Sequence, residues 1–135
     1  MEDTVLEGLL KKHEGFANTT GLKLVTAKAG YAEGELDIKQ MHYNPIGSVH
    51  GGCIFTLADT IGGAAVASNG VVCTTLSSNI DYLNAAIESK KLLAKATPVR
   101  VGKRIFVYDV NVYDEAERHI AKVSITYYVI KCANK

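Results

Sequence analysis

Several residue types that mark special classes of protein are scarce in this chain of 135 residues. It has no tryptophan, two prolines and three cysteines. The odd number of cysteines, the lack of a Cys-x-x-Cys pair and the lack of a histidine at zinc-finger spacing argue against a disulfide framework or a structural zinc site. We interpret Cys53, Cys73 and Cys132 as small apolar fillers, because no basic neighbour in the sequence activates a thiol.

Long apolar runs and an excess of one charge are also absent. No stretch of 18 apolar residues occurs, so no membrane-spanning helix is expected. The acidic start at Glu2 and Asp3 is unlike a signal peptide, and we therefore expect a cytoplasmic protein. Lysine plus arginine (15) nearly balances aspartate plus glutamate (14), which argues against a nucleic-acid-binding protein. The ordinary globular composition and the length predict one domain over residues 1–135.

Hydrophobic periodicity predicts two helices and six strands. A short amphipathic helix is expected from Asp3 to Gly15, and two alternating strands follow at 22–26 and 32–39, joined by a turn at Ala29-Gly30. Further strands rich in Val, Ile, Thr and Tyr are expected at 71–84, 91–101, 104–113 and 119–131. Between the two groups, residues 51–68 predict a helix that is small or apolar almost all round, and therefore buried. This order favours an α+β fold with an antiparallel sheet wrapped around one central helix.

Asp59 is the only formally charged residue between Gln40 and Ile80, and it lies in the middle of the apolar helix. A buried carboxylate is rare unless it is paired or hydrogen-bonded. One interpretation is structural, with a hydrogen bond to Thr56, to Thr60 or to a neighbouring strand. We favour a functional one, in which Asp59 is a nucleophile or general base in a pocket, because aspartate is a poor residue for the middle of a helix.

The start of the same helix is a second candidate site. Gly51 and Gly52 leave backbone N–H groups unobstructed at the positive end of the helix dipole, where they can bind an oxyanion or a phosphate. A tight turn explains the glycine pair about as well, and His50 beside it is either a structural hydrogen-bonding residue or a catalyst. His50 and Asp59 are about two and a half turns apart and do not share a face. Two copies of the chain meeting across this helix could bring them together.

The pattern Asn44-Pro-x-Gly-x-x-His50-Gly51-Gly52, followed by Leu57-Ala58-Asp59, resembles the signature of hotdog-fold acyl-CoA thioesterases. The phenylacetyl-CoA thioesterase (PaaI-like) group is the subfamily that it resembles most. The resemblance extends over roughly residues 21–130. It implies a hotdog fold, which is a strongly curved antiparallel sheet around one long helix, assembled as a homodimer or a homotetramer.

The resemblance also implies a role for each matching residue. Asp59 is the nucleophile or the general base, and the N–H of Gly51 forms the oxyanion hole. Gly52 beside it is a substrate-binding residue. Asn44 positions the thioester or the water, and His50 orients the loop and the thioester. The Ser or Thr that assists on the following strand is matched by Thr75, with Thr74 as the alternative one position away. In the family, the site is shared between two subunits, with Asn44 and Gly51 facing Asp59 and Thr75 of the other subunit.

Four further residues are candidates for substrate binding, and each also has a purely structural interpretation. Arg100, Lys103 and Arg104 surround a predicted turn, where they are either solvated charges or contacts to the phosphates of coenzyme A. Tyr82 either packs in its strand or lines the acyl pocket.

We predict hydrolysis of an acyl-CoA thioester, with no metal and no cofactor other than the coenzyme A of the substrate. The alternatives are a hotdog enoyl-CoA hydratase or dehydratase and a non-catalytic acyl-CoA-binding protein. The acyl group is not determined by the sequence.

Overall fold

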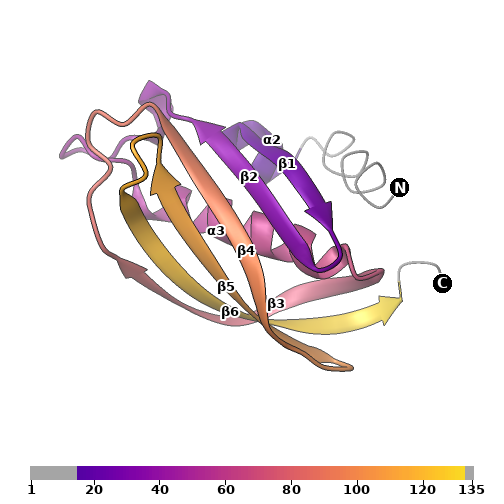
Figure 1. Cartoon of the computed structure of the whole chain (residues 1–135). Helices are drawn as coiled ribbons and strands as arrows, with labels where there is room; N and C mark the ends of the chain where they lie inside the picture. The colour runs from indigo at the N-terminus through magenta and orange to yellow at the C-terminus, as the bar shows by residue number, and fades with distance from the viewer. Residues whose placement is uncertain (1–14, 133–135) are drawn as a thin grey trace.

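A computed structural model describes residues 15–132, so the helix predicted for Asp3–Gly15 lies outside the described residues apart from its last one. One six-stranded antiparallel sheet has the order β1-β2-β4-β5-β6-β3 (Figure 1). The strands are β1 (Leu22–Lys28), β2 (Tyr31–Asp37), β3 (Val71–Tyr82), β4 (Lys91–Val101), β5 (Ile105–Asp114) and β6 (His119–Cys132). The helical segments are α2 (Phe16–Thr20), a short 3₁₀ turn η1 (Gln40–His42) and α3 (Gly51–Ala67).

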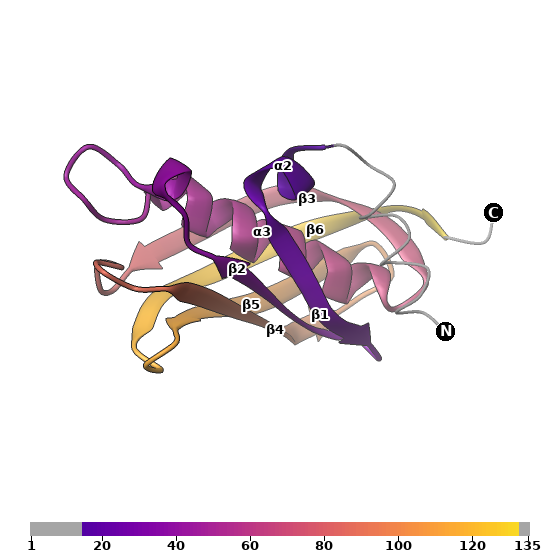
Figure 2. The ribbon, with the colours of Figure 1, turned by 90° about the horizontal axis from the view of Figure 1, so that it is seen from above.

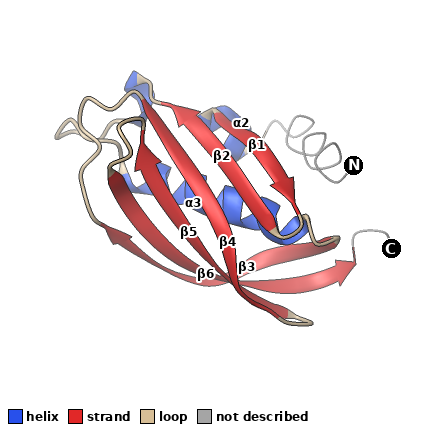
Figure 3. Ribbon diagram, viewed as in Figure 1, coloured by secondary structure: helices blue, strands red, loops and turns tan. Residues whose placement is uncertain are grey.

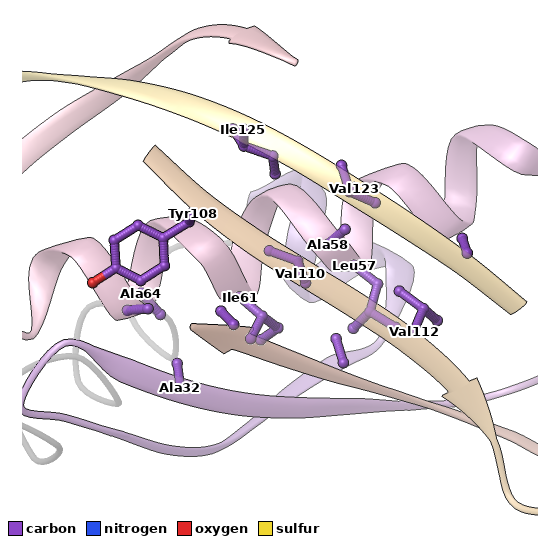
Figure 4. Packing of buried hydrophobic residues seen from close by; sticks show 14 of the residues in the cluster. Ala32, Leu57, Ala58, Ile61, Ala64, Tyr108, Val110, Val112, Val123 and Ile125 are labelled. Atoms are coloured by element: carbon purple, nitrogen blue, oxygen red, sulfur yellow. The ribbon is translucent and has the colours of Figure 1, made fainter. Parts of the chain in front are cut away.

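The sheet curves around α3, which lies along its concave face (Figure 2, Figure 3). Strands β2 and β5 alternate between buried and partly buried residues along their whole length, because every second side chain points to the helix. Figure 4 shows Val110 and Val112 of β5 next to Leu57 and Ile61 of α3. All four side chains are buried. The predicted α+β arrangement of a curved antiparallel sheet around one long helix is therefore confirmed.

Two short helical segments were not expected from the sequence. α2 has five residues and η1 has three, too few for a helical period to show. The larger elements follow the predictions within two residues at most ends. Ala29 and Gly30 form the predicted hairpin turn, both with positive φ (53° and 83°), as a two-residue turn between twisted strands requires.

Strands β1 and β3 are the two edges of the sheet. β1 contacts both α2 and α3. β3 also contacts α3, but all of its 12 residues are exposed or only partly buried. Each edge strand carries a bulge, at Val25 in β1 and at Leu76 in β3. Among the described residues, no helix is long and apolar enough to cross a membrane.

Candidate functional site

Helix α3 begins at Gly51 with His50 as its N-cap residue. The Nδ1 atom of the His50 ring accepts a hydrogen bond from the Gly52 N–H at 2.8 Å. Nδ1 is therefore unprotonated, and in the neutral ring the proton is on Nε2. The N–H of Gly51 has no hydrogen-bond acceptor within residues 15–132, as the first turn of a helix leaves it. The start of α3 thus presents two donors, the backbone N–H of Gly51 and the ring N–H of His50.

Asn44 shapes the loop that leads into α3. Its Oδ1 accepts from the Ser48 N–H (3.0 Å) and from the Ile46 N–H (3.1 Å), and its Nδ2 donates to the Ser48 hydroxyl (2.8 Å). An amide nitrogen has two protons, so one donor of Asn44 remains for a substrate or a water molecule. Figure 2 shows this loop at the same end of the sheet as the start of α3.

His42 fixes the position of this loop, and the sequence analysis missed it. It is 3% exposed, its Nδ1 accepts from the Lys39 N–H (2.9 Å), and its Nε2 contacts the Thr20 carbonyl oxygen (2.6 Å). Its own carbonyl accepts from the His50 N–H (2.8 Å). His42 therefore connects the ends of α2 and β2 to the N-cap of α3. No local sequence pattern distinguishes such a histidine from an exposed one.

A pocket of about 270 Å³ lies against the start of α3. Its lining contains no charged side chain and consists of Asn44, Ser48, Val49, Gly51, Ile54, Tyr82, Leu83, Asn84, Ala85 and Ala86. The Tyr82 hydroxyl donates to the Gly51 carbonyl oxygen at 2.8 Å, and burial raises the pKa of Tyr82. A Cβ atom at Gly51 would lie only 2.9 Å from this hydroxyl, so a glycine is needed for the contact.

Asp59 lies halfway along α3 and is half-buried. Its Oδ1 accepts a hydrogen bond of 2.6 Å from the Thr75 hydroxyl on β3. Thr75 pairs with Tyr127 of β6, a buried residue that faces the helix, whereas Thr74 pairs with Tyr128 on the opposite face. The structure therefore brings Thr75, and not Thr74, to Asp59.

The two groups of candidate residues are separated within one chain. Asn44, His50 and Gly51 lie at the start of α3, and Asp59 lies further along the same helix. A rise of 1.5 Å per residue puts Gly51 and Asp59 about 12 Å apart along the helix axis. One carbonyl group cannot contact both of them.

Arg100, Lys103 and Arg104 are exposed at the turn between β4 and β5, which extends beyond the rest of the sheet in Figure 1. Arg104 donates to the Tyr128 hydroxyl at 3.4 Å. Pairing across the sheet runs from Thr75 through Tyr127 and Phe106 to Val101 at the base of this turn. Three strand spacings make this row about 14 Å long.

The described residues contain no group of three or more His, Cys, Asp or Glu side chains that could hold a metal ion. The thiols near the candidate site are also weak nucleophiles. Burial, together with the negative charge of Asp59, raises the pKa of Cys73 to about 11, and burial raises the pKa of Cys53 to about 11.

The sequence profile of the thioesterase superfamily matches residues 46–121, which is more than half of the chain. The chain belongs to the thioesterase superfamily. A curated relative from Archaeoglobus fulgidus, named only as an esterase, is 35% identical over 106 residues, covering 78% of this chain and 69% of the relative. The acyl-coenzyme A thioesterase PaaI of Escherichia coli is 26% identical over 110 residues, covering 82% of this chain and 79% of PaaI.

Solved thioesterase structures have the same architecture as this superfamily member. The PaaI structure superimposes with a TM-score of 0.90 at 23% identity, covering 97% of this chain and 95% of PaaI, which supports the hotdog fold. A Streptococcus pneumoniae thioesterase protein with coenzyme A has a TM-score of 0.78 at 29% identity, covering 83% of this chain and 88% of that chain. Alanine mutants of the pneumococcal protein, one at an aspartate and one at a threonine 16 positions later, are also similar.

Proposed function

We propose that this thioesterase-superfamily enzyme hydrolyses an acyl-CoA thioester to a free carboxylic acid and coenzyme A, with Asp59 as the catalytic carboxylate. The observation that carries the proposal is the Asp59 carboxylate, held at 2.6 Å by the Thr75 hydroxyl in an otherwise uncharged helix. The pneumococcal mutants support it, since their aspartate and threonine have the same spacing of 16 positions as Asp59 and Thr75. The name of PaaI supports the reaction.

The chemistry needs few groups, because a thioester carbonyl is already electrophilic. Asp59 takes a proton from a water molecule, the water oxygen attacks the carbonyl carbon, and the oxygen of the tetrahedral intermediate is stabilised by the Gly51 N–H. The carbon–sulfur bond then breaks, the thiolate of coenzyme A leaves, and the proton on Asp59 passes to that thiolate, which restores the carboxylate. In the alternative, Asp59 attacks the carbonyl itself and water hydrolyses the resulting anhydride. Asn44 and His50 position the thioester in both routes.

Two copies of the chain form each site in this proposal. Gly51 and Asp59 of one chain are about 12 Å apart, which is too far for one carbonyl group to contact both. Strand β3 supports the assembly, because it is a long edge strand with unpaired backbone groups on one side and exposed apolar residues such as Leu76. Pairing of β3 between copies gives a homodimer, and two dimers give a homotetramer.

The acyl group occupies the pocket beside Gly51, with Tyr82 as one wall. This pocket supports an uncharged acyl group, because its lining has no charged side chain to neutralise one. Arg100, Lys103 and Arg104 contact the phosphates of coenzyme A. The row from Thr75 to their turn, about 14 Å long, has a length that an extended pantetheine arm can span.

The proposal includes no metal and no cofactor beyond the coenzyme A of the substrate, and it expects a cytoplasmic enzyme. No observation favours the alternatives of an acyl-CoA-binding protein or an enoyl-CoA hydratase.

Thiol release from a panel of acyl-CoA esters tests the reaction. The panel pairs butyryl-CoA with succinyl-CoA and benzoyl-CoA with hexanoyl-CoA, and Ellman's reagent measures the free thiol. We expect turnover of at least one uncharged ester, with succinyl-CoA hydrolysed more slowly than butyryl-CoA. Binding of acyl-CoA without thiol release would indicate a binding protein instead. A change in enoyl absorbance of crotonyl-CoA without thiol release would indicate a hydratase.

A further inference from the structure

Tyr127 of β6 contacts the turn of α3 that carries Asp59. Its side chain is 1% exposed, and its hydroxyl donates to the backbone carbonyl oxygen of Asp59 at 3.0 Å. Burial raises the pKa of Tyr127, and the negative charge of Asp59 raises it further. The hydroxyl therefore keeps its proton and remains a donor over the whole working range of pH.

Tyr127 and Thr75 hold Asp59 from the same place in the sheet. They are direct partners across β6 and β3, and both side chains reach α3. Thr75 binds the carboxylate of Asp59, while Tyr127 binds its main chain. Two contacts from adjacent strands fix both the position of the helix turn and the direction of the side chain that it carries.

Gly62 makes the Tyr127 contact possible. It lies in α3 almost one turn after Asp59, and a Cβ atom at this position would be 2.2 Å from the Tyr127 hydroxyl oxygen. Glycine is unfavourable inside a helix, so its presence here has a packing reason, which is the close approach of this hydroxyl. Tyr127 on the sheet therefore supplies the hydrogen-bond donor, and Gly62 on the helix leaves the space that its hydroxyl occupies.

We propose that Tyr127 is a positioning residue for the Asp59 carboxylate and that Gly62 makes room for it, an inference that rests on the proposed role of Asp59 in hydrolysis. The mechanism is geometric. Without the Tyr127 hydroxyl, the middle of α3 is free to shift on the sheet, and the carboxylate moves relative to Thr75 and to the thioester. A displacement of about 1 Å at a reacting group costs up to ~100-fold in rate.

The fold supplies a matched control in Tyr108. This tyrosine of β5 is also fully buried, and its hydroxyl also donates to a backbone carbonyl, that of Gly30, at 2.6 Å. Its ring packs edge-on against Tyr127 at 6.4 Å between centroids. Figure 4 shows it beside Ala64, further along α3. Tyr127→Phe and Tyr108→Phe therefore each remove one buried hydroxyl–carbonyl hydrogen bond, but only the first touches Asp59. Tyr108→Phe also removes the hydroxyl that accepts from the Asn69 side chain at 3.4 Å.

The experiment compares kcat, KM and melting temperature of wild type, Tyr127→Phe and Tyr108→Phe. Because each variant loses a buried hydroxyl–carbonyl hydrogen bond, we expect both to melt a few degrees lower, with Tyr108→Phe destabilised at least as much as Tyr127→Phe. We expect kcat to fall ~10- to 100-fold in Tyr127→Phe with little change in KM, and to stay within about twofold of wild type in Tyr108→Phe. Equal kcat in the two variants would overturn the proposal.

A second measurement is independent of activity. The carbon-13 resonance of the Asp59 carboxyl group, assigned by its loss in Asp59→Asn, should move in Tyr127→Phe and stay in place in Tyr108→Phe. If the wild type released no thiol from any acyl-CoA, the proposed function would fail, and this resonance alone would decide whether Tyr127 positions the side chain. An unchanged resonance in Tyr127→Phe would contradict the inference.

Gly62→Ala tests the other half of the pair. The added methyl group collides with the Tyr127 hydroxyl, so we expect lower stability and a kcat as low as that of Tyr127→Phe. In the double variant with Tyr127→Phe, the colliding oxygen is absent and only the contacts of 3.2 Å to the ring Cζ and to Val110 remain, so stability should recover in part while kcat stays low. Equal stability losses for Gly62→Ala with and without the hydroxyl would contradict the pairing.

Discussion

The Asp59 carboxylate has one oxygen committed and one available. Oδ1 accepts from the Thr75 hydroxyl, and within residues 15–132 no hydrogen bond to Oδ2 is present. A half-buried carboxylate with a free oxygen is suited to hold a water molecule or to attack a carbonyl. The Thr75 contact orients the group without neutralising it, since a hydroxyl carries no charge.

We predict that Asp59→Asn lowers kcat by at least ~100-fold while the fold and the oligomer persist, because asparagine keeps the shape but cannot accept a proton. Steady-state thiol release measures the effect, and circular dichroism with sedimentation checks the fold and the assembly. Asp81→Asn is the control, since Asp81 is an exposed carboxylate of the same strand that carries Thr75. An Asp59→Asn enzyme with near wild-type kcat would exclude the carboxylate from the chemistry.

The elements of the fold could be predicted from the sequence because their signals are local. Period-two alternation in β5 and the small, apolar residues of α3 reflect which side chains face the core. The contacts of the site are not local in this way. The pairing of Thr75 with Tyr127 depends on the register of β3 and β6, which shifts at Leu76 in β3 and at Ile130 in β6. Thr75 was favoured by the family resemblance, whereas for Tyr127 the sequence predicts only a place in the strand at 119–131.

The two edge strands give a direct test of the interface. Leu76 of β3 and Val25 of β1 are both exposed aliphatic residues at a bulge, 60% and 52% exposed. If β3 pairs between copies, a lysine at Leu76 places a charge in the interface, whereas a lysine at Val25 does not. We therefore predict that Leu76→Lys shifts sedimentation towards the monomer and lowers specific activity at nanomolar concentration by at least ~10-fold.

Val25→Lys should keep the wild-type sedimentation and activity. Dissociation in Val25→Lys, with an intact oligomer in Leu76→Lys, would place the interface on β1 instead.

At the scale of the whole molecule, two groups that the reaction needs close together lie at different places along α3. The helix start provides the free N–H of Gly51, and the middle of the helix provides the carboxylate of Asp59. In the two-fold assembly that we propose, the start of one helix lies near the middle of the other, and two identical sites result. Each chain then contributes a different half to each of the two sites. A substitution in one half of the site on one chain therefore inactivates one of the two sites and leaves the other intact.

This arrangement predicts that two inactive variants restore activity when they are mixed. A mixed dimer of Asn44→Ala and Asp59→Asn chains has one doubly damaged site and one intact site. Random exchange of equal amounts makes about half of the dimers mixed, so about a quarter of wild-type activity should return, provided that each variant alone is strongly impaired and the sites act independently. A site contained within one chain predicts no recovery, because every chain in the mixture then carries a lesion in its own site. Subunit exchange confirmed by mass spectrometry, without any gain in thiol release, would therefore rule out the shared site.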